Sequence, residues 1–364
     1  MTTPTIPNGA SYMAATIYTG DGSQTISFSN AVNGTAFQPD MVWSKIRTGT
    51  TQAIGVFDSV RGTTGQALDT AATTAEGTWN GAASSDYGYV SAFNSNGFSV
   101  NDGAVATTGG YVNYATRTYV AWQWKAGGTA VSNTSGSITS SVSANTTSGF
   151  SVVTYTGNGT AGATVGHGLG VAPQVIIVKN RGTVTNWQFG SSYNNATSPW
   201  NYYMRLNTTA AAAAASTIWN NTAPSSSVFT VGTDNEVNFS ANTYVAYCWT
   251  PIAGYSAFGS YAGNSSTDGP FIYTGFRPRF VMLKASSGTT GNWIMLDTSR
   301  DTYNMAVNVL EADVSDAEAA LSPMIDIVSN GFKIRRNSAG VNSSGCTYIY
   351  VCFAENPFKY ANAR

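Results

Sequence analysis

The stretch Tyr119-Val120-Ala121-Trp122-Gln123-Trp124 occurs three times in this chain in related form. The second and third copies are Thr243-Tyr244-Val245-Ala246-Tyr247-Cys248-Trp249 and Thr347-Tyr348-Ile349-Tyr350-Val351-Cys352-Phe353. In the first copy Tyr119 and Ala121 alternate with Val120, Trp122 and Trp124. Because successive side chains of a strand point to opposite faces, each copy predicts a β-strand that is buried on both faces. We therefore expect three related units, each closed by one such strand.

Two further landmarks precede the closing strand in every unit. Each unit opens on a strand that ends in a Tyr before a turn of small residues, namely Tyr18-Thr19-Gly20-Asp21-Gly22, Tyr155-Thr156-Gly157-Asn158-Gly159 and Tyr261-Ala262-Gly263-Asn264-Ser265. A Pro then stands six residues before a Lys, in the pairs Pro39 and Lys45, Pro173 and Lys179, and Pro278 and Lys284. The Pro is expected to begin a strand, where its missing N–H does no harm. The Lys is expected to end the buried run as a surface residue with a covered stem.

The first and third units share two more motifs. Phe57-Asp58-Ser59-Val60-Arg61 matches Leu296-Asp297-Thr298-Ser299-Arg300, whereas the second unit has Ser192 at this place and no Arg. The simplest interpretation is a turn in which Asp caps the backbone and pairs with the Arg. Asn96-Gly97-Phe98 likewise matches Asn330-Gly331-Phe332, and Asn-Gly before alternating apolar residues predicts a β-hairpin.

The spacing of these landmarks supports duplication of one unit. From the Lys to the closing Tyr the three units span 119 − 45 = 74, 244 − 179 = 65 and 348 − 284 = 64 residues. A capping-box spacing from Ser315 to Glu318, ahead of an Ala-rich run, predicts one short helix in the third unit. Many short strands separated by turn signals otherwise predict an all-β fold of tandem antiparallel β-sandwiches with few short helices.

The landmarks also divide the chain. The expected parts are an N-terminal attachment tail (1–13), a first sandwich (14–127), a Ser/Thr/Asn-rich linker (128–148), a second sandwich (149–251), a third sandwich (255–356) and a C-terminal tail (357–364). The linker is long for a domain junction and is expected to be extended or partly strand-forming. The short connection between the second and third units predicts that these two pack rigidly.

Composition limits the function classes. Only 10% of the 364 residues are charged and 42% are hydrophobic, so a core is available while the surface depends on Ser, Thr, Asn and Gly. The net charge of −1 and the lack of a basic patch give no support to a nucleic-acid partner. The N-terminus does not resemble a signal peptide, and no apolar run is long enough to predict a membrane span.

The sequence predicts no catalytic, cofactor-binding or metal-binding residues. His167 is the only histidine and lies in a Gly-rich loop, without a nucleophile motif to make a triad. Asp234 and Glu236 are expected on one face of a strand, which is a weak signal for a metal or acid pair without a third ligand. A site of the His/Cys type is absent from the sequence, while calcium bound through backbone oxygens stays an open question. Cys248, Cys346 and Cys352 are expected to be small buried thiols.

Several aromatic residues lie outside the repeated strands. If exposed, they offer surfaces on which sugars or a neighbouring subunit can stack; the simpler expectation is that they anchor loops to the sandwiches. These residues are Trp79, Trp200, Tyr202, Tyr203 and Trp219.

The repeated motifs give the chain a resemblance to a known family over about residues 14–356. The Pro-to-Lys strand, Phe57-Asp58-Ser59-Val60-Arg61-Gly62, Ser95-Asn96-Gly97-Phe98 and the Tyr-Val-Ala-Trp strand resemble repeated domains of virion proteins from tailed bacteriophages, common in marine phages. The layout is also similar to concanavalin-like, jelly-roll or SPRY-like β-sandwiches. The second unit departs from the motifs at the Asp-Arg turn and at Asn-Gly-Phe.

The resemblance implies a non-enzymatic virion structural protein, assembled in the host cytoplasm, that contacts other virion proteins. A tail fibre or appendage that helps to bind a host-surface glycan is the first expectation, and a capsid decoration or head-fibre protein is the alternative. A carbohydrate-binding or carbohydrate-active β-sandwich protein is a further alternative. A homotrimer is expected by analogy with fibres and decorations, and neither a nucleic-acid nor a membrane partner is expected.

Overall fold

The structure is a computed structural model, and it describes residues 6, 8–23, 25–32, 34–49, 54–63, 66–79, 82–103 and 110–357. Of residues 78, 79, 82–85 and 355–357 only the backbone is described. The described chain is almost entirely β-structure in antiparallel sheets, which confirms the predicted all-β class. Its strands fall into three units that match the three copies of the repeated sequence.

The first unit holds a five-stranded sheet with the order β1-β10-β3-β4-β5, a three-stranded sheet with the order β2-β9-β8, and the hairpin β6-β7. The strands are β1 (Met13–Thr19), β2 (Ile26–Ser29), β3 (Met41–Ile46), β4 (Ile54–Asp58), β5 (Leu68–Asp69), β6 (Thr78–Trp79), β7 (Ala82–Ala83), β8 (Tyr89–Asn94), β9 (Gly97–Asn101) and β10 (Thr118–Trp124). Two 3-10 helices, η1 (Gly9–Ser11) and η2 (Ser84–Tyr87), accompany them.

The second unit holds an eight-stranded sheet with the order β11-β12-β13-β20-β15-β16-β17-β18 and the pair β14-β19. The strands are β11 (Val131–Asn133), β12 (Ser140–Asn145), β13 (Phe150–Thr156), β14 (Ala163–Gly166), β15 (Val175–Asn180), β16 (Gln188–Ser191), β17 (Tyr202–Arg205), β18 (Ala213–Ala214), β19 (Val228–Val231) and β20 (Thr243–Trp249). The helices are η3 (Pro199–Asn201) and α1 (Ser216–Trp219). Strands β11 and β12 come from the expected linker, so this segment extends the sheet of the second unit.

The third unit is one eight-stranded sheet with the order β21-β28-β23-β24-β25-β26-β27-β22. The strands are β21 (Ser256–Ala262), β22 (Phe271–Tyr273), β23 (Phe276–Ser287), β24 (Ile294–Asp297), β25 (Ala306–Glu311), β26 (Ala319–Val328), β27 (Gly331–Ile334) and β28 (Thr347–Pro357). The helix predicted after Ser315 is wrong, because Ala319 begins β26, whose pairing with β25 and β27 overrides the local helix signal.

The same five strands form the main sheet of each unit in the same order. They are β1-β10-β3-β4-β5, β13-β20-β15-β16-β17 and β21-β28-β23-β24-β25. The opening and closing Tyr residues face each other across each first strand pair, as Tyr18 and Tyr119, Tyr155 and Tyr244, and Tyr261 and Tyr348. These pairs stack with ring centroids 5.1, 5.1 and 5.2 Å apart. Shared order and register confirm that the sequence repeat is a structural repeat.

The first and second units each have a core of their own between two β-layers, while the core of the third unit is continuous with the central cluster. In the first unit Tyr119 and Ala121 of β10 pack with Phe98 and Val100 of β9 in one hydrophobic cluster. In the second, Tyr244 of β20 packs with Phe229 of β19 in another. The predicted Asn-Gly hairpins are present as β8-β9 and β26-β27.

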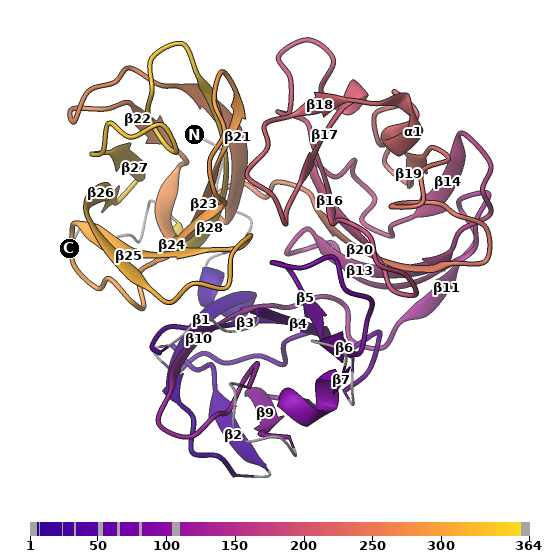
Figure 1. Ribbon diagram of the computed structural model, residues 1–364, viewed down its shortest axis with the longest axis horizontal. Helices are drawn as coiled ribbons and strands as arrows, with labels where there is room; N and C mark the ends of the chain where they lie inside the picture. The colour runs from indigo at the N-terminus through magenta and orange to yellow at the C-terminus, as the bar shows by residue number, and fades with distance from the viewer. Residues whose placement is uncertain are drawn as a thin grey trace.

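The three units lie around a common centre, and Figure 1 shows them as three lobes. The other face of each closing strand points to this centre, where the equivalent residues Trp124, Trp249 and Phe353 meet. Their ring centroids are 6.1, 5.5 and 6.4 Å apart for the three pairs, a closed triangle of aromatic contacts. The void among these rings is only about 10 Å³, so the hub is packed solid. The closing strand is therefore buried on both faces as predicted, but its second face packs against the other two units.

The described N-terminal residues pack against this body and do not form the expected tail. Ile6 is buried in the central cluster, and Tyr12 contacts Tyr255 of the third unit edge to face at 6.0 Å. Residues 6 and 8–13 therefore belong to the packed body, while 358–364 lie outside the described residues.

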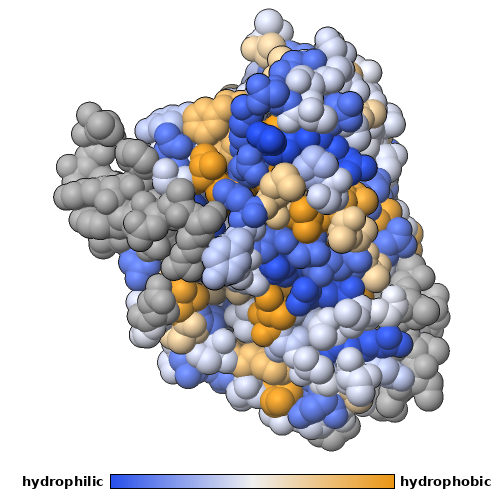
Figure 2. Space-filling model, turned by 90° about the vertical axis from the view of Figure 1, so that its left-hand side faces the viewer, coloured by the Kyte–Doolittle hydropathy of each residue, from blue (hydrophilic) through white to orange (hydrophobic). Residues whose placement is uncertain are grey.

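The surface shows little concentration of hydrophobic residues on the face in Figure 2, where they form separate spots among hydrophilic and intermediate residues. Across the described residues, no helix has the length and apolar character needed to cross a membrane.

Candidate functional site

The three repeated Lys residues are buried, and the expectation that they lie at the surface is wrong. Lys45, Lys179 and Lys284 each have no exposed surface. Lys45 Nζ donates to the carbonyl oxygens of Glu311, at 2.7 Å, and Val314 in the third unit. The buried strand carries each Lys to the interface, where a neighbouring unit replaces the expected solvent.

The other two Lys residues make the same kind of contact around the ring. Lys179 Nζ donates to Thr73 O of the first unit at 3.0 Å and to Thr185 O at 2.6 Å. Lys284 Nζ donates to Thr208 O of the second unit at 3.3 Å and to Gly291 O. The Lys of the first unit thus binds the third unit, that of the second binds the first, and that of the third binds the second. Together these bonds link the three units in a closed cycle.

Burial changes the protonation of these ammonium groups. It lowers the pKa of Lys179 to about 7 and the pKa values of Lys45 and Lys284 to about 8, since the charged form loses its hydration. Nearby carboxylates oppose the effect, Glu236 for Lys179 and Asp313 for Lys284. Each amine is nevertheless held by carbonyl oxygens between units, which is an architectural contact.

The Asp-Arg turn of the first unit is the centre of a buried polar network that reaches the second unit. Asp58 accepts from the backbone N–H of Arg61 at 2.9 Å and pairs with its guanidinium, as the sequence predicted. Asp58 also accepts from Tyr247 Oη of the second unit at 2.7 Å. Glu76 then links Arg61, at 2.7 Å, to Arg181 of the second unit, also at 2.7 Å. Burial opposes the charge of Arg61, but Asp58 and Glu76 raise the pKa of Arg61 above its ordinary value.

The third unit repeats this network against the first. Asp297 pairs with Arg300 at 2.6 Å and accepts from Trp122 Nε1 of the first unit at 3.0 Å. Glu318 links Arg300, at 3.0 Å, to Arg47 of the first unit, at 2.8 Å. The sequence signal found the Asp and Arg, but not the partners, which come from other units.

The interface between the third and second units lacks this network. Strand pairing places Ser191 opposite Val175, as Asp58 stands opposite Met41, so the equivalent of Asp58 is Ser191 and not Ser192, one residue later. The equivalent of Arg61 is Asn194, whose Nδ2 donates to Phe189 O at 3.3 Å. Because the turn of the second unit is one residue shorter, spacing from Lys179 gave the neighbouring position.

The remaining members of the network are missing from the same interface. Ala212 N donates to Ser286 O at 3.0 Å, just as Glu76 N donates to Arg181 O at 2.9 Å. Ala212 therefore replaces the Glu, and Ser286 replaces the Arg. The residue of the third unit's closing strand equivalent to Tyr247 is Val351, which has no side-chain donor. All five positions are uncharged at this one interface.

A polar cavity of about 430 Å³ lies where the network is missing. It is lined by Ser192, Tyr193, Asn194, Asn195, Ala196, Ser260, Ser286, Ser287 and Thr347. We call it the interface cavity.

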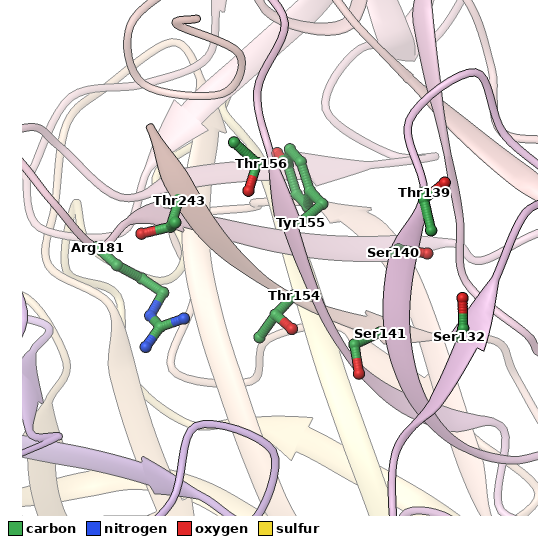
Figure 3. Close-up of a pocket in the computed structure, with 9 residues that line it drawn as sticks. All are labelled: Ser132, Thr139, Ser140, Ser141, Thr154, Tyr155, Thr156, Arg181 and Thr243. Atoms are coloured by element: carbon green, nitrogen blue, oxygen red, sulfur yellow. The ribbon is translucent and has the colours of Figure 1, made fainter. Parts of the chain in front are cut away.

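A second hollow of about 360 Å³ is lined by residues of the second unit near its interface with the first, and Figure 3 shows these residues. Ser132, Ser141 and Thr154 form a row of hydroxyl groups across β11, β12 and β13. Arg181 stands at the other side of the hollow and is ion-paired with Glu76 of the first unit. We call this hollow the hydroxyl groove. Thr154 and Arg181 correspond to Ser260 and Ser286 of the interface cavity.

The single histidine is a structural residue. His167 is fully buried, its Nδ1 accepts from Leu169 N at 3.2 Å, and its Nε2 lies 3.2 Å from Ser225 O. Burial lowers the pKa of His167. These bonds fix the loop before β15 and leave no ring nitrogen free.

Asp234 and Glu236 lie in a turn and not on one strand face, so the expected alternation is wrong. Asp234 Oδ1 accepts from Glu236 N at 2.9 Å, a local turn contact. The Glu236 carboxylate accepts from Asn186, Gln188 and Arg205. Among the described residues no group of three His, Cys, Asp or Glu side chains is placed to hold a metal ion.

The loop aromatics and cysteines mostly follow the simpler expectation. Trp200 and Trp219 are buried and pack edge to face at 5.6 Å, anchoring loops of the second unit. Tyr202 and Tyr203 are half-buried, and the side chain of Trp79 lies outside the described part. The three cysteines are buried free thiols, as predicted.

A repeated buried Asn was missed by the sequence reasoning. Asn113, Asn238 and Asn342 have no exposed surface, and each accepts from the backbone of the turn after the opening Tyr. Each stands six residues before a closing Tyr, and this constant spacing is the signal that was available.

Comparison with known proteins gives one match. The model of a family described as a domain of unknown function, DUF7483, matches residues 8–357. The match spans all three units together, and the chain belongs to this family. Neither the curated proteins nor the solved structures include a match.

Proposed function

We propose that this member of the DUF7483 family is a non-enzymatic structural protein of a bacteriophage virion, a tail fibre or other appendage that contributes to host-surface binding. The resemblance of its repeated motifs to virion domains motivates the proposal. In this setting it acts within the particle, after assembly in the host cytoplasm, beside other virion proteins.

The observation that carries the proposal is the closed ring of three units. Buried Lys bonds, two buried polar networks and the aromatic hub join the units into one body. Groups that often serve catalysis, such as a Lys with a pKa of about 7, are here bonded to backbone oxygens between units. This is what a part that must keep its shape outside a cell needs.

We also infer that each unit is a sandwich of the concanavalin-like or jelly-roll type. The shared order of five main strands and the second, smaller layer support this assignment. An experimental structure compared unit by unit with known sandwiches tests it; a different strand connection in the second layer would contradict it.

Labelling of intact phage particles tests the virion assignment. Gold-conjugated antibody against the purified protein is expected at the tail or its fibres in electron micrographs. Label spread over the whole capsid would replace the tail-fibre assignment by decoration. Particles free of label, with the protein also missing from their digested peptides, would overturn the proposal.

A capsid decoration is the second candidate, and the pseudo-threefold ring favours it. A body with three similar units around one centre can make similar contacts with all three subunits around a threefold axis of a shell, which a body without this symmetry cannot. Analytical ultracentrifugation separates the two arrangements: a chain that fills a threefold position by itself sediments as a monomer of 38.1 kDa, whereas the homotrimer expected by analogy is three times heavier.

A further inference from the structure

The interface cavity differs from the rest of the ring because a short side chain stands where the other units have a long one. Asn194 copies two contacts of Arg61: its Nδ2 donates to Phe189 O and Tyr202 O, where the guanidinium donates to the equivalent oxygens of Val56 and Gln66. The Asn side chain is shorter than Arg, and Ala212 and Ser286 fill less space than Glu and Arg. The volume that the charged network fills at the other two interfaces is thus open between the second and third units.

The walls of the cavity hold hydrogen-bonding groups without partners in the protein. The hydroxyl groups of Ser192, Ser260 and Ser287 form no hydrogen bond with another described residue. Asn194 is 3% exposed, and its Oδ1 is buried with no hydrogen-bond partner. That oxygen lies below the cavity surface, so the groups within reach of a ligand are the three Ser hydroxyls, of which those of Ser260 and Ser287 are on exposed residues and that of Ser192 is on a half-buried one.

The chemistry of the cavity excludes strong recognition of charge. None of the nine lining residues is charged, and the nearest counterpart, Arg181 in the hydroxyl groove, is replaced here by Ser286. Tyr193 adds an aromatic ring, which is held by its hydroxyl donating to Gln174 Oε1 at 3.3 Å. Hydroxyl groups, amides and one ring at the edge are the groups that bind uncharged sugars.

We infer that the interface cavity binds a neutral saccharide of one or two sugar units. Its volume of about 430 Å³ lies within the ordinary range for a small-ligand pocket. This inference rests on the proposed role in host-surface binding, because it names the site and the class of glycan.

Binding to an immobilised panel of neutral mono- to tetrasaccharides, with sialylated and sulfated counterparts, tests the ligand class. The full chain is expected to bind a subset of the neutral sugars and to lose no affinity when the salt concentration is raised. Preference for the charged counterparts, or binding to none of the panel, would overturn the inference.

Ser260→Trp tests the site. Ser260 is exposed on β21, so a large ring there fills the cavity without entering the core. We expect affinity for the neutral sugar to fall about tenfold or more, since ligand contacts are excluded. Thr154→Trp, at the equivalent position in the hydroxyl groove, is the matched control and is expected to bind like the natural protein. Both variants are first compared with it by circular dichroism and thermal unfolding.

A milder variant keeps the test independent of the size of Trp. Ser192→Ala with Ser287→Ala removes two free hydroxyl groups and is expected to weaken binding several-fold, about threefold to tenfold. Unchanged affinity in both this variant and Ser260→Trp would place the sugar elsewhere and refute the cavity assignment.

Cell binding separates this inference from the proposed function. If the fluorescent protein binds host cells, and Ser260→Trp binds them equally well, the cavity assignment fails and host attachment stands. If the protein binds neutral sugar through the cavity but no host cell, the site stands and the attachment role fails.

Discussion

Two interfaces can be compared directly: that of the second unit with the first, and that of the third unit with the second. Both contain bonds from buried side chains to backbone oxygens of the neighbouring unit, but only one contains a network of charged side chains. In both, a buried Lys donates to a carbonyl oxygen of the neighbour, Lys179 to Thr73 and Lys284 to Thr208. A Trp does the same, Trp187 to Asp69 O at 2.8 Å and Trp293 to Arg205 O at 3.0 Å. Only the first of these interfaces adds Asp58, Arg61, Glu76 and Arg181.

The difference teaches which contacts the ring requires. Backbone acceptors and the aromatic hub are present at every interface, so they are sufficient to join two units. The charged network is an addition that must be complete, because one buried charge without its partner is more costly than none. At the interface of the third and second units all five positions are uncharged, and a cavity lies beside them.

The largest expected effect comes from breaking one complete network. Asp58→Ala removes the partner of a buried guanidinium and the acceptor of Tyr247. We expect the free energy of unfolding to fall by about 3–5 kcal/mol in urea titrations. Ser191→Ala, at the equivalent position without a network, is the control and is expected to cost about 0.5 kcal/mol or less. Equal losses would show that the network contributes nothing particular to its interface.

The pH dependence of stability tests the buried Lys. The pKa of Lys179 is lowered to about 7 by burial, while the unfolded chain keeps the ordinary value of about 10.4. Between these values the unfolded state binds more protons, so this residue's contribution to stability rises with pH and is lost as pH falls toward 7. From pH 7 to 9 the rise is expected to be about 2 kcal/mol.

Lys179→Met provides the reference for that measurement. Subtracting its unfolding free energy from that of the natural protein at each pH cancels the titration of Tyr and Cys residues, and the difference is expected to grow from pH 7 to 9. A flat difference would contradict a buried amine with a lowered pKa.

The Gly in the turn after the opening Tyr is common to all units, so replacing it should lower the free energy of unfolding by a similar amount in each unit. A Cβ added to Gly157 or Gly263 would overlap a backbone carbonyl oxygen, of Phe239 and Ser343 respectively. We expect Gly157→Ala and Gly263→Ala to lower the unfolding free energy by similar amounts, about 1–3 kcal/mol each. Clearly unequal losses would show that the units are equivalent in their strands but not in this turn.

The smallest effect is expected for the outer ion pair. Arg181 and Glu76 lie 2.7 Å apart, with side chains 21% and 11% exposed. Arg181→Ser and Glu76→Ala, alone and together, introduce the residue types that Ser286 and Ala212 provide at the interface of the third and second units. Their coupling in a double-mutant cycle is expected to be about 1 kcal/mol or less, because water screens the pair. A coupling energy as large as the stability loss of Asp58→Ala would show that the outer ion pair stabilises the interface as much as the buried Asp58–Arg61 pair.

The repeat, the Asn-Gly hairpins and the buried closing strands were readable from the sequence, because they depend on local spacing. A Tyr that faces a Tyr, or a Gly in a tight turn, is fixed by neighbours within the same unit. The predicted helix after Ser315 failed for the opposite reason, since pairing of β26 with distant strands decides its state.

The stretch Tyr119–Trp124 and its copies determined by themselves that three units exist and that each closes on a strand buried on two faces. Only the tertiary structure decided what covers the second face: Trp124, Trp249 and Phe353 meet at the hub, and the Lys at each strand end enters a neighbouring unit. The pattern of apolar residues indicates that a face of the strand is buried, but not which surface covers it. Contacts between units are made by residues far apart in the chain, as in Lys45 with Glu311, and no local spacing encodes them.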